Sequence, residues 1–468
     1  MSDQTNENAQ SSIKQQKSMG KELRKQTPRS SHGDWVPAAD RPDPISLLQA
    51  QDTGRLQHLI PIKYGRMLES PFAFLRGSAV VMASDLASTP TTGLKVVLCG
   101  DAHLSNFGVF ATPERNLVFD INDFDESYPG PWEWDLKRLA TSAVVAGREN
   151  GFSDKKCKKL ATIVSKSYRE SMGRFAQAHI LDVWYFHVDA DRALKVFDKY
   201  AGKGAKGAQK TVKKARSRTR QQTLNKLTEV VDGKRQIVSD PPLLVPLRQL
   251  LSDDQKERIS QQDTKKLWLE YVDSLPVERR LLLSRFRITD VALRVGGVGS
   301  VGTRCTIALL EGDADDEDDA LILQQKEAGP SVLEAYLPKR GYASQSQRVV
   351  IGRRLMQASS DIFLGWNRGL TGIQYYWRQL KDMKGSFDVT RLNAKGLGTY
   401  LGLCGVCLAR AHARTGDPIA ISGYLGSGDV FDKAISNFAL AYADRTERDH
   451  QALVDAVESG RIVAEVGV

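Results

Sequence analysis

Apolar positions in the first half of the chain follow the 3.6-residue spacing of helices, interrupted by two short runs that suit buried strands. The run LKVVLCG, residues 94–100, predicts one strand, and NLVFDIN, residues 116–122, predicts the other. Residues 1–40 are polar and rich in Gln, Ser and Lys, so we expect a disordered tail. The helical pattern covers residues 43–95, residues 132–180 and the segment from there to about residue 285.

The pattern changes near Arg287, after which β-branched residues and glycines dominate. ALILQQKEA, residues 320–328, predicts a strand, and the acidic segment 311–319 predicts the turn of a hairpin. A capping box of Ser331 and Glu334 indicates a helix that begins at Ser331. Beyond it, the pattern predicts a further strand and a long helix, at residues 371–380 and 394–414.

Together these elements predict an α+β fold in which a β-rich part is inserted between helical parts. The candidate site, described below, falls in the first helical part. We therefore expect four segments: a disordered tail over 1–40, a helical lobe over 41–285, a β-rich lobe over 286–390, and a helical segment over 391–468 that completes the helical lobe.

Composition and charge favour a globular chain that does not enter a membrane. Of the 468 residues, 41% are hydrophobic and 26% are charged, and no apolar run is long enough for a membrane span or a secretory leader. Five cysteines are too few for a disulfide framework, so we expect a cytoplasmic protein. The net charge of +10 suits anionic partners such as nucleotides or phosphorylated compounds.

Part of the positive charge lies in one basic stretch, residues 202–235. The stretch contains no aromatic residue on which a nucleic-acid base could stack. We therefore interpret it as a solvated helix or loop, and nucleic-acid binding stays as the alternative.

The segment GDAHLSNFG follows the first predicted strand and carries the candidate chemistry. Asp101 can accept a proton from an attacking hydroxyl group, and the amide oxygen of Asn106 can bind Mg²⁺ beside nucleotide phosphates. A second carboxylate comes from FDINDFDES, where either Asp120 or Asp123 is a candidate metal ligand. His103 is the other candidate for the catalytic site, and we expect it mainly to hold the shape of the loop. The alternative is that these residues only form turns and cap helices.

A glycine motif follows the change to β-rich sequence. Gly297, Gly299 and Gly302 spell G-x-G-x-x-G, and a strand-like segment follows, as in the glycine-rich loop of kinases. In dinucleotide-binding folds the same motif opens a helix instead. Lys326, on the next predicted strand, is a candidate for binding nucleotide phosphates. A helix glutamate usually accompanies this lysine, and Glu334 is the candidate.

These motifs resemble the kinase-like fold of aminoglycoside phosphotransferases, choline kinases and HipA-type kinases. In those families a strand leads into G-D-x-H-x-x-N, a second strand leads to an Asp followed by Phe or Trp, and a helix carrying D-L-A comes next. The interval from Asp123 to Asp135 suits this pattern, so Asp123 is preferred to Asp120 as metal ligand. The corresponding residues here are Gly100, Asp101, His103 and Asn106, then Asp123 and Phe124, then Asp135 and Leu136.

The parts occur in an unusual order. An ordinary kinase-like chain runs from the glycine loop and the lysine to the catalytic loop, whereas here the catalytic loop comes first. The segment CLARAHART, residues 407–415, resembles the helix that normally precedes the catalytic loop. We therefore expect a two-lobed, protein-kinase-like fold that is circularly permuted. Over about residues 43–450 the chain also resembles the uncharacterised bacterial family catalogued as domain of unknown function 2252.

The kinase-like resemblance implies an ATP- and Mg²⁺-dependent phosphotransferase. It would transfer a phosphoryl or a nucleotidyl group to a small-molecule or protein acceptor that the sequence does not identify. Asp101 would act as the base, Asn106 and Asp123 would hold the metal, and Lys326 with the glycine motif would bind the phosphates. Two alternatives stay open: an inactive nucleotide-binding pseudokinase or scaffold, and a nucleic-acid-binding protein.

Overall fold

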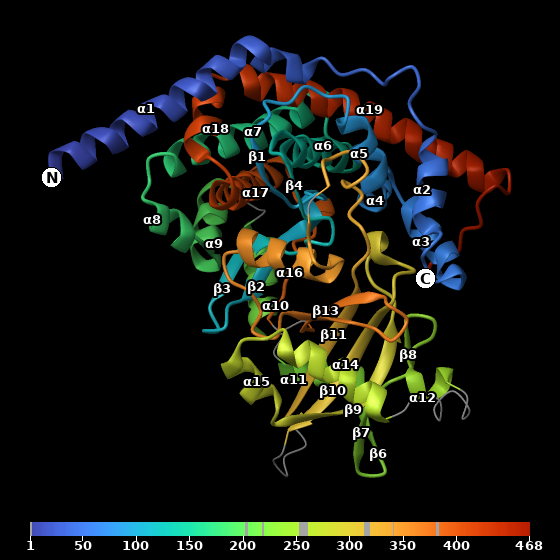
Figure 1. Cartoon of the computed structure of the whole chain (residues 1–468). Coiled ribbons are helices and arrows are strands. Elements are labelled where there is room, and N and C mark those ends of the chain that lie inside the picture. Colours follow the sequence, from blue (N-terminus) through green and yellow to red (C-terminus); the bar gives the residue numbers. More distant parts are fainter. Residues whose placement is uncertain are drawn as a thin grey trace.

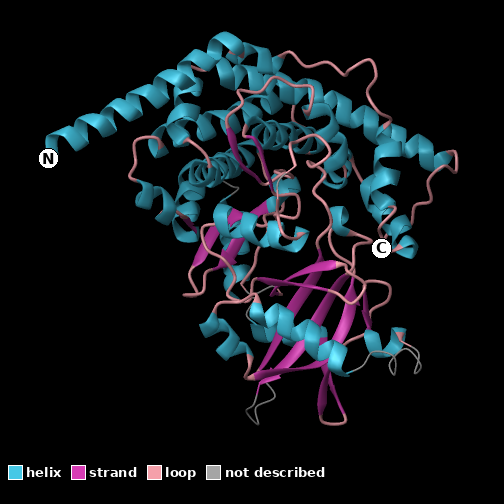
Figure 2. Ribbon diagram, in the orientation of Figure 1, coloured by secondary structure: helices cyan, strands magenta, loops and turns pink. Residues whose placement is uncertain are grey.

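The computed structural model describes residues 2–201, 205–217, 220–251, 261–312, 319–339, 341–380 and 383–468, and the structural statements below concern these residues. Helices and several separate sheets combine in an α+β arrangement (Figure 2), which confirms the predicted class. Among the described helices, none combines the length and the apolar character needed to pass through a bilayer.

The helices gather mainly in the upper part of the molecule as drawn in Figure 1. Those before the first strand are α1 (Ser2–Gln26), α2 (Pro44–Asp52), α3 (Ile60–Leu68), α4 (Pro71–Gly77) and α5 (Ala79–Leu86). The larger core helices are α6 (Glu133–Glu149), α7 (Asp154–Phe175), α17 (Ala394–Thr415), α18 (Pro418–Leu425) and α19 (Val430–Glu458). The remaining ones are α8 (Ile180–Tyr185), α9 (Ala190–Tyr200), α10 (Ala205–Ser217), α11 (Arg220–Leu227), α12 (Leu247–Leu250), α14 (Gln261–Asp273), α15 (Val277–Leu283) and α16 (Gln345–Met356).

The main hydrophobic core lies where α6, α7, α17 and α19 pack together. Helix α6 is buried on nearly every side, from Glu133 to Gly147. Small residues let α17 approach α7 closely, because a Cβ atom at Gly405 would lie 2.8 Å from the carbonyl oxygen of Val164. This packing places the predicted helix 394–414 at the centre of the molecule, as α17.

The largest sheet has six strands in the order β12-β13-β11-β10-β9-β8, and every neighbouring pair is antiparallel (Figure 2). Successive residues of β10 alternate between two apolar clusters: Ile307 and Leu309 pack toward Leu224 of α11, and Ala308 and Leu310 pack toward α14 and α15. Both faces are therefore buried, which explains the nearly continuous apolar runs. The strands are β8 (Leu244–Pro246), β9 (Phe286–Arg294), β10 (Cys305–Gly312), β11 (Ala320–Glu327), β12 (Gly365–Arg368) and β13 (Gln374–Gln379).

Smaller sheets connect the helical part to this sheet. β1 (Lys95–Leu98) pairs with β4 (Tyr128–Pro131), and β2 (Phe107–Ala111) forms a hairpin with β3 (Leu117–Ile121), to which β5 (Val188–Asp189) is added. The two strands predicted in this region are present as β1 and β3, whereas β2 and β4 were not predicted. β6 (Thr228–Val231) and β7 (Lys234–Ile237) form a separate hairpin.

The prediction of a disordered tail over residues 1–40 is wrong for the segment that packs on the core. Helix α1 lies along α18, where Arg24 donates to the carbonyl oxygens of Tyr424 (2.8 Å) and Gly423 (2.5 Å). His32 is buried and its Nε2 lies 2.8 Å from the hydroxyl of Tyr424. Tertiary contacts therefore order a segment whose composition alone indicates disorder.

Two further predictions are corrected. The helix expected at Ser331 is absent, although Ser331 N donates to Glu334 Oε1 (3.0 Å) as in a capping box. The chain forms turns instead, because Pro338 lacks the N–H that a continuing helix needs, and the next helix is α16.

The segment expected to be helical up to residue 285 contains the β6–β7 hairpin. Its turn is Asp232-Gly233, where both residues have positive φ, of 51° and 71°. A D-G pair between β-branched runs is a strong hairpin signal, and the helical interpretation passed over it. The β10–β11 hairpin is present as predicted, but residues 313–318 of its acidic turn lie outside the described residues.

The docking of α1 can be tested with a single methyl group. A Cβ atom at Gly20 would lie 2.1 Å from the carbonyl oxygen of Ala420, so Gly20→Ala should lift α1 from α18 and lower the melting temperature. The matched control is Gly207→Ala in α10, where a Cβ atom meets nothing within 4 Å. Alanine favours a helix over glycine by about 1 kcal/mol, so the control should be neutral or slightly stabilising. Limited proteolysis near residue 27 reports the same change, and equal behaviour of the two variants would contradict the docking.

Candidate functional site

A cleft of about 1080 Å³ is lined by residues from two distant stretches of the chain, within 99–126 and 282–386, together with Arg220 and a few residues near the N-terminal helices. Most residues singled out in the sequence line it: Asp101, His103, Asn106, Asp123, Gly297, Gly299 and Lys326. The other three candidates, Asp120, Gly302 and Glu334, are described by the structure but do not line the cleft.

The turn that follows β1 is held by a carboxylate of α6. Asp135 accepts hydrogen bonds from the backbone N–H groups of Cys99 (2.6 Å) and Gly100 (2.9 Å), and its Oδ2 lies 3.2 Å from Nε2 of His412 on α17. Gly100 has a φ of 81°, and a Cβ atom there would lie 2.2 Å from the carbonyl oxygen of Glu126. Only glycine fits this position, so the turn has one conformation.

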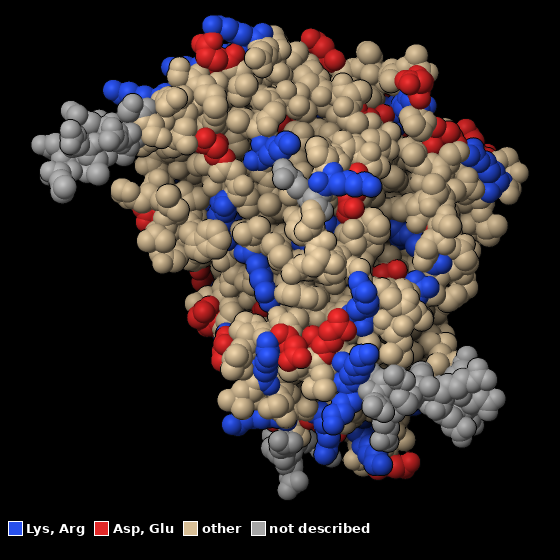
Figure 3. All heavy atoms as spheres, in the orientation of Figure 1, with Lys and Arg blue, Asp and Glu red and all other residues tan. Residues whose placement is uncertain are grey.

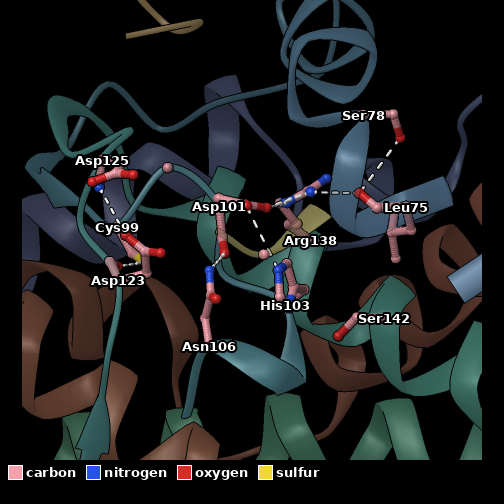
Figure 4. A network of polar contacts seen from close by, with 12 residues as sticks. Leu75, Ser78, Cys99, Asp101, His103, Asn106, Asp123, Asp125, Arg138 and Ser142 are labelled. Carbon is pink, nitrogen blue, oxygen red and sulfur yellow. Dashed lines mark hydrogen bonds and ion pairs between the residues drawn. The ribbon is translucent and has the colours of Figure 1, made fainter. Parts of the chain in front are cut away.

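Asp101 projects from this turn and forms an ion pair with Arg138 of α6. Arg138 Nε lies 2.6 Å from Asp101 Oδ1, and Nη2 contacts the same oxygen. Figure 4 shows Arg138 between Asp101 and the carbonyl oxygen of Leu75, which accepts a 2.8 Å hydrogen bond from Nη2. One carboxylate oxygen of Asp101 is therefore neutralised by the protein, and the other, Oδ2, makes no hydrogen bond within the described residues.

Asn106 is fixed by its amide nitrogen, which donates to the carbonyl oxygen of Asp101 (2.6 Å; Figure 4). Its own backbone oxygen accepts from Asn122 N (2.7 Å), which links the turn to the end of β3. Within the described residues, Asn106 Oδ1 makes no hydrogen bond to the protein. That oxygen is therefore the available acceptor of a side chain in the cleft wall.

His103 is buried and uncharged at neutral pH. Burial lowers its pKa to about 4, and the nearby charges of Arg76 and Arg138 act in the same direction, against that of Asp101. Its ring Nε2 lies 3.6 Å from Asp101 Oδ2, too far for a hydrogen bond, and Nδ1 has no partner in the described part of the chain. In this structure His103 packs against Phe72 and supports the loop.

The carboxylate of Asp123 faces several cations of the cleft. Burial alone would raise the pKa of this carboxyl, but the positive charges of Lys326, Arg378 and Lys384 outweigh burial and hold the pKa well below its usual range. The hydrogen bond to the carboxylate is long, from Asp125 N at 3.3 Å, and no cation pairs with it at close range among the described residues. Asp123 is therefore an ionised carboxylate whose oxygens are largely unused by the protein.

Lys326 pairs with a residue that the sequence analysis did not single out. Its ammonium group contacts the carboxylate of Asp125, which also accepts a 2.7 Å hydrogen bond from the hydroxyl of Tyr376. The expected pairing of Lys326 with Glu334 is therefore wrong. Glu334 instead accepts from Ser331 N (3.0 Å) and lies 3.6 Å from Arg348, because the turn around Pro338 keeps it at the base of α16.

Asp120 is a buried structural anion and not a cleft residue, which corrects its place among the metal ligands. Arg410 Nη2 of α17 lies 2.6 Å from each of its carboxylate oxygens, and Ala358 N donates to Oδ2 at 2.7 Å. Both charged side chains are about 1–2% exposed. The reason is strand geometry: Asp120 lies within β3 and faces α17, whereas Asp123 lies beyond the strand end.

The glycine motif forms the connection between β9 and β10 and contains a short 3-10 helix, Val298–Ser300. Gly297 and Gly299 line the cleft, and Gly302 adopts a φ of 84° behind it. Arg55 fixes the motif by donating to the carbonyl oxygens of Gly299 (3.0 Å) and Val301 (2.5 Å). The motif is thus held against the N-terminal helices rather than extended freely over the sheet.

The sequence analysis missed the cleft residues Asp125, Arg353, Arg378 and Lys384, and also Arg138 and Tyr376, which bind the cleft residues Asp101 and Asp125. A signal existed for Arg138, which follows Asp135 by three residues and so shares its face of α6. Asp125 lies two residues after Asp123 and could have been weighed as an equal candidate. The others depend on long-range packing of residues 353–384 against the turn, which no local pattern reports.

The oxygen donors of the cleft suit a hard cation whose other ligands are phosphates and water molecules. No group of three or more His, Cys, Asp or Glu side chains in the described ranges is arranged to hold a metal ion. Mg²⁺ does not need such a group, since it commonly takes one or two protein oxygens and fills its remaining positions with phosphates and water. The available Asn106 Oδ1 and the ionised, sparsely bonded carboxylate of Asp123 meet that requirement.

The basic stretch lies mostly away from the cleft. Of its described residues, Arg220 lines the cleft, and Arg216 pairs with Asp191 at 2.7 Å on the surface. On the face drawn in Figure 3, blue and red side chains lie close together over the sheet region rather than forming a field of one sign. One side of α10 is buried through Ala208, Val212 and Ala215. Nucleic-acid binding through this stretch stays an untested alternative.

Comparison with known proteins finds a family to which the chain is similar. The family described as an uncharacterized protein conserved in bacteria (DUF2252) matches residues 55–456, most of the chain. The protein belongs to this family. No curated protein and no solved structure matches it. The family match begins at Arg55, which fixes the glycine motif, and it includes the cleft residues of both stretches.

The different roles of Asp120 and Asp123 predict different effects on stability. Asp120→Asn leaves the buried Arg410 without its counter-ion and should reduce the free energy of unfolding by about 3–5 kcal/mol. Asp123→Asn is also nearly isosteric, but the carboxylate that it removes makes no close ion pair within the described residues. Its loss of unfolding free energy should therefore be clearly smaller. Urea denaturation of the two variants beside the wild type measures the difference. Equal losses would contradict the assignment of Asp120 as the structural residue.

Proposed function

We propose that the protein is an ATP- and Mg²⁺-dependent phosphotransferase with a kinase-like site. The observation that carries the proposal is the meeting, in one cleft, of a hard-cation donor pair and a surrounding group of cations. Asn106 and Asp123 supply the donor pair, and Lys326, Arg378 and Lys384 supply the cations. This combination is what a metal-bound polyphosphate requires.

Among the described residues that line the cleft, eight are Lys or Arg and five are Asp or Glu. Burial lowers the pKa of Lys384 to about 7, and the like charges of Arg378 and Arg353 act in the same direction. A bound polyphosphate would add negative charge beside these cations and favour protonated Lys384. The cleft is therefore better suited to an anion with several charges than to a neutral ligand.

In this proposal, different residues around the turn accept the proton, hold the metal and contact the phosphates. Asp101, oriented by Arg138, would accept the proton of the acceptor's hydroxyl group while the γ-phosphoryl group moves to that oxygen and ADP leaves. Asn106 and Asp123 would hold Mg²⁺, which when bound neutralises the charge of the phosphates. Lys326, steadied by Asp125 and Tyr376, would contact the phosphates.

The order of these parts along the chain supports a permuted kinase-like arrangement. Gly297 and Gly299 of the glycine motif and Lys326 line the same cleft as Asp101, although they follow it by about two hundred positions. The helix that resembles the one before a kinase catalytic loop is α17. Its His412 lies 3.2 Å from Asp135, which holds the turn, so α17 meets the catalytic turn in space.

Calorimetry with Mg·ATP tests the proposal, combined with labelled ATP to follow transfer. We expect Mg²⁺-dependent binding to the wild type, loss of binding in Asp123→Ala, and retained binding in Asp101→Ala. Turnover should fall on the order of a thousandfold in both variants, because each removes charge stabilisation or proton transfer at the reacting group. Movement of a γ-phosphate label indicates phosphoryl transfer, and movement of an α-phosphate label indicates nucleotidyl transfer.

The matched control is Asp388→Ala, which removes an exposed carboxylate outside the cleft and should leave binding and turnover unchanged. Circular dichroism of every variant separates loss of function from loss of fold. Binding without any transfer would identify an inactive nucleotide-binding protein. Absence of Mg·ATP binding to the folded wild type would contradict the proposal altogether.

A further inference from the structure

Arg76 is a cleft cation that the proposed phosphate site does not use. It lies in the last turn of α4, one residue after Leu75, whose carbonyl oxygen Arg138 binds at 2.8 Å. Arg138 in turn pairs with Asp101, so α4 is tied directly to the candidate base. The charge of Asp101 is the largest of those acting on the Arg76 guanidinium, which places Arg76 at the Asp101 end of the cleft.

Arg76 differs from its neighbours in having no hydrogen-bond or ion-pair partner among the described residues. Lys326 pairs with Asp125, Arg138 with Asp101, and Arg378 donates to Gln324 at 2.9 Å. Within the described residues Arg76 makes neither a hydrogen bond nor an ion pair, and its Nε is buried without an acceptor. Burial lowers the pKa of Arg76, and the charges of Asp101, Glu69 and Glu149 offset this effect only in part, so the protein holds the guanidinium charge at a net cost.

A second unsatisfied group lies on the same side of the cleft. Gln51 of α2 lines the cleft, and its buried Oε1 meets no donor from the described ranges. Both residues flank the glycine motif: the carbonyl oxygen of Arg76 is 3.3 Å from the place of a Cβ atom at Gly299, and Arg55, one turn after Gln51, donates to Gly299 O at 3.0 Å. A ligand with an anionic group for Arg76 and a separate hydrogen-bond donor for Gln51 would satisfy both residues.

We infer that the acceptor is a hydroxyl compound that carries its own anionic group, a carboxylate or a phosphate, and that Arg76 binds this group. The inference rests on the proposed function and adds the class of acceptor to it. Arg138 already neutralises one oxygen of Asp101, so the charge of Arg76 serves the acceptor and not the base. A planar guanidinium matches either oxyanion with two parallel hydrogen bonds. With its anionic group on Arg76, the acceptor presents its hydroxyl to Asp101.

The test measures anion binding after the nucleotide site has been filled. The full chain is saturated with Mg²⁺ and a non-hydrolysable ATP analogue, and inorganic phosphate is titrated in by calorimetry. We expect the wild type to bind phosphate and Arg76→Gln to bind it at least tenfold more weakly. Arg76→Lys should bind phosphate with an intermediate affinity, because lysine keeps the positive charge but lacks the two parallel N–H donors of the guanidinium. The matched control Arg391→Gln makes the same charge change at an exposed site and should bind phosphate as the wild type does.

The affinity for the ATP analogue, measured first on every variant, separates the possible outcomes. Loss of phosphate binding with unchanged nucleotide affinity supports the inference. If Arg76→Gln weakens the analogue as much as it weakens phosphate, Arg76 belongs to the nucleotide site and the inference fails. It also fails if the nucleotide-saturated wild type binds no phosphate, or if Arg76→Gln binds it unchanged. If the wild type binds no analogue at all, the proposed function fails, and phosphate binding by Arg76→Gln and Arg391→Gln without nucleotide still tests Arg76.

Two small probes then distinguish the sources of the anionic group. Glycerol 3-phosphate and glycerate each carry a hydroxyl and an anionic group, whereas glycerol lacks the anionic group. Each is tested as a phosphoryl acceptor with γ-labelled ATP and as a competitor of phosphate. Preference for one of the anionic probes over glycerol supports the inference and names the oxyanion. Competition by glycerol equal to that of both anionic probes would contradict it.

Discussion

The carboxylate of Asp135 joins three parts of the molecule that are far apart in the sequence. From the first turn of α6 it accepts two backbone hydrogen bonds from the turn after β1, and it lies beside His412 of α17. The ring of His412 is held from its other side by the hydroxyl of Tyr168 on α7, at 2.9 Å. A turn in which Gly100 has a positive φ is thereby attached to the most tightly packed helices of the protein, and the position of Asp101 follows from that attachment.

From this fixed turn, the properties of the cleft follow by electrostatics. Asp101 has a dedicated cation in Arg138, whereas Asp123 shares the field of several cations and pairs closely with none in the described structure. The two carboxylates therefore differ in kind: the first is oriented by the protein, and the second is left with oxygens that can accept an external cation. Such a division is expected when one group moves a proton and the other holds a metal with its phosphates.

Local sequence patterns predicted the parts of the structure that local forces determine. The strands β1 and β3, the hairpin β10–β11 and the helix α17 were all visible as periodic or continuous apolar runs. The tail was misjudged because α1 is ordered by Arg24 and Gly20 against α18, contacts that span about four hundred residues. In the site, Asp101 and Asn106 could be proposed from spacing, whereas Asp123 was preferred to Asp120 only through the kinase-like resemblance. The ion pair of Asp120 with Arg410 could not be predicted, since no spacing reports a partner on a distant helix.

The central claim is that one cleft binds a metal–nucleotide complex through residues from both distant stretches of the chain. It is tested most directly by a crystal structure with Mn²⁺ and a non-hydrolysable ATP analogue, in which anomalous scattering locates the metal. The account predicts the metal at Asn106 and Asp123, with the phosphates against Lys326. A metal held by other residues, or phosphates bound away from Asp123, would contradict it.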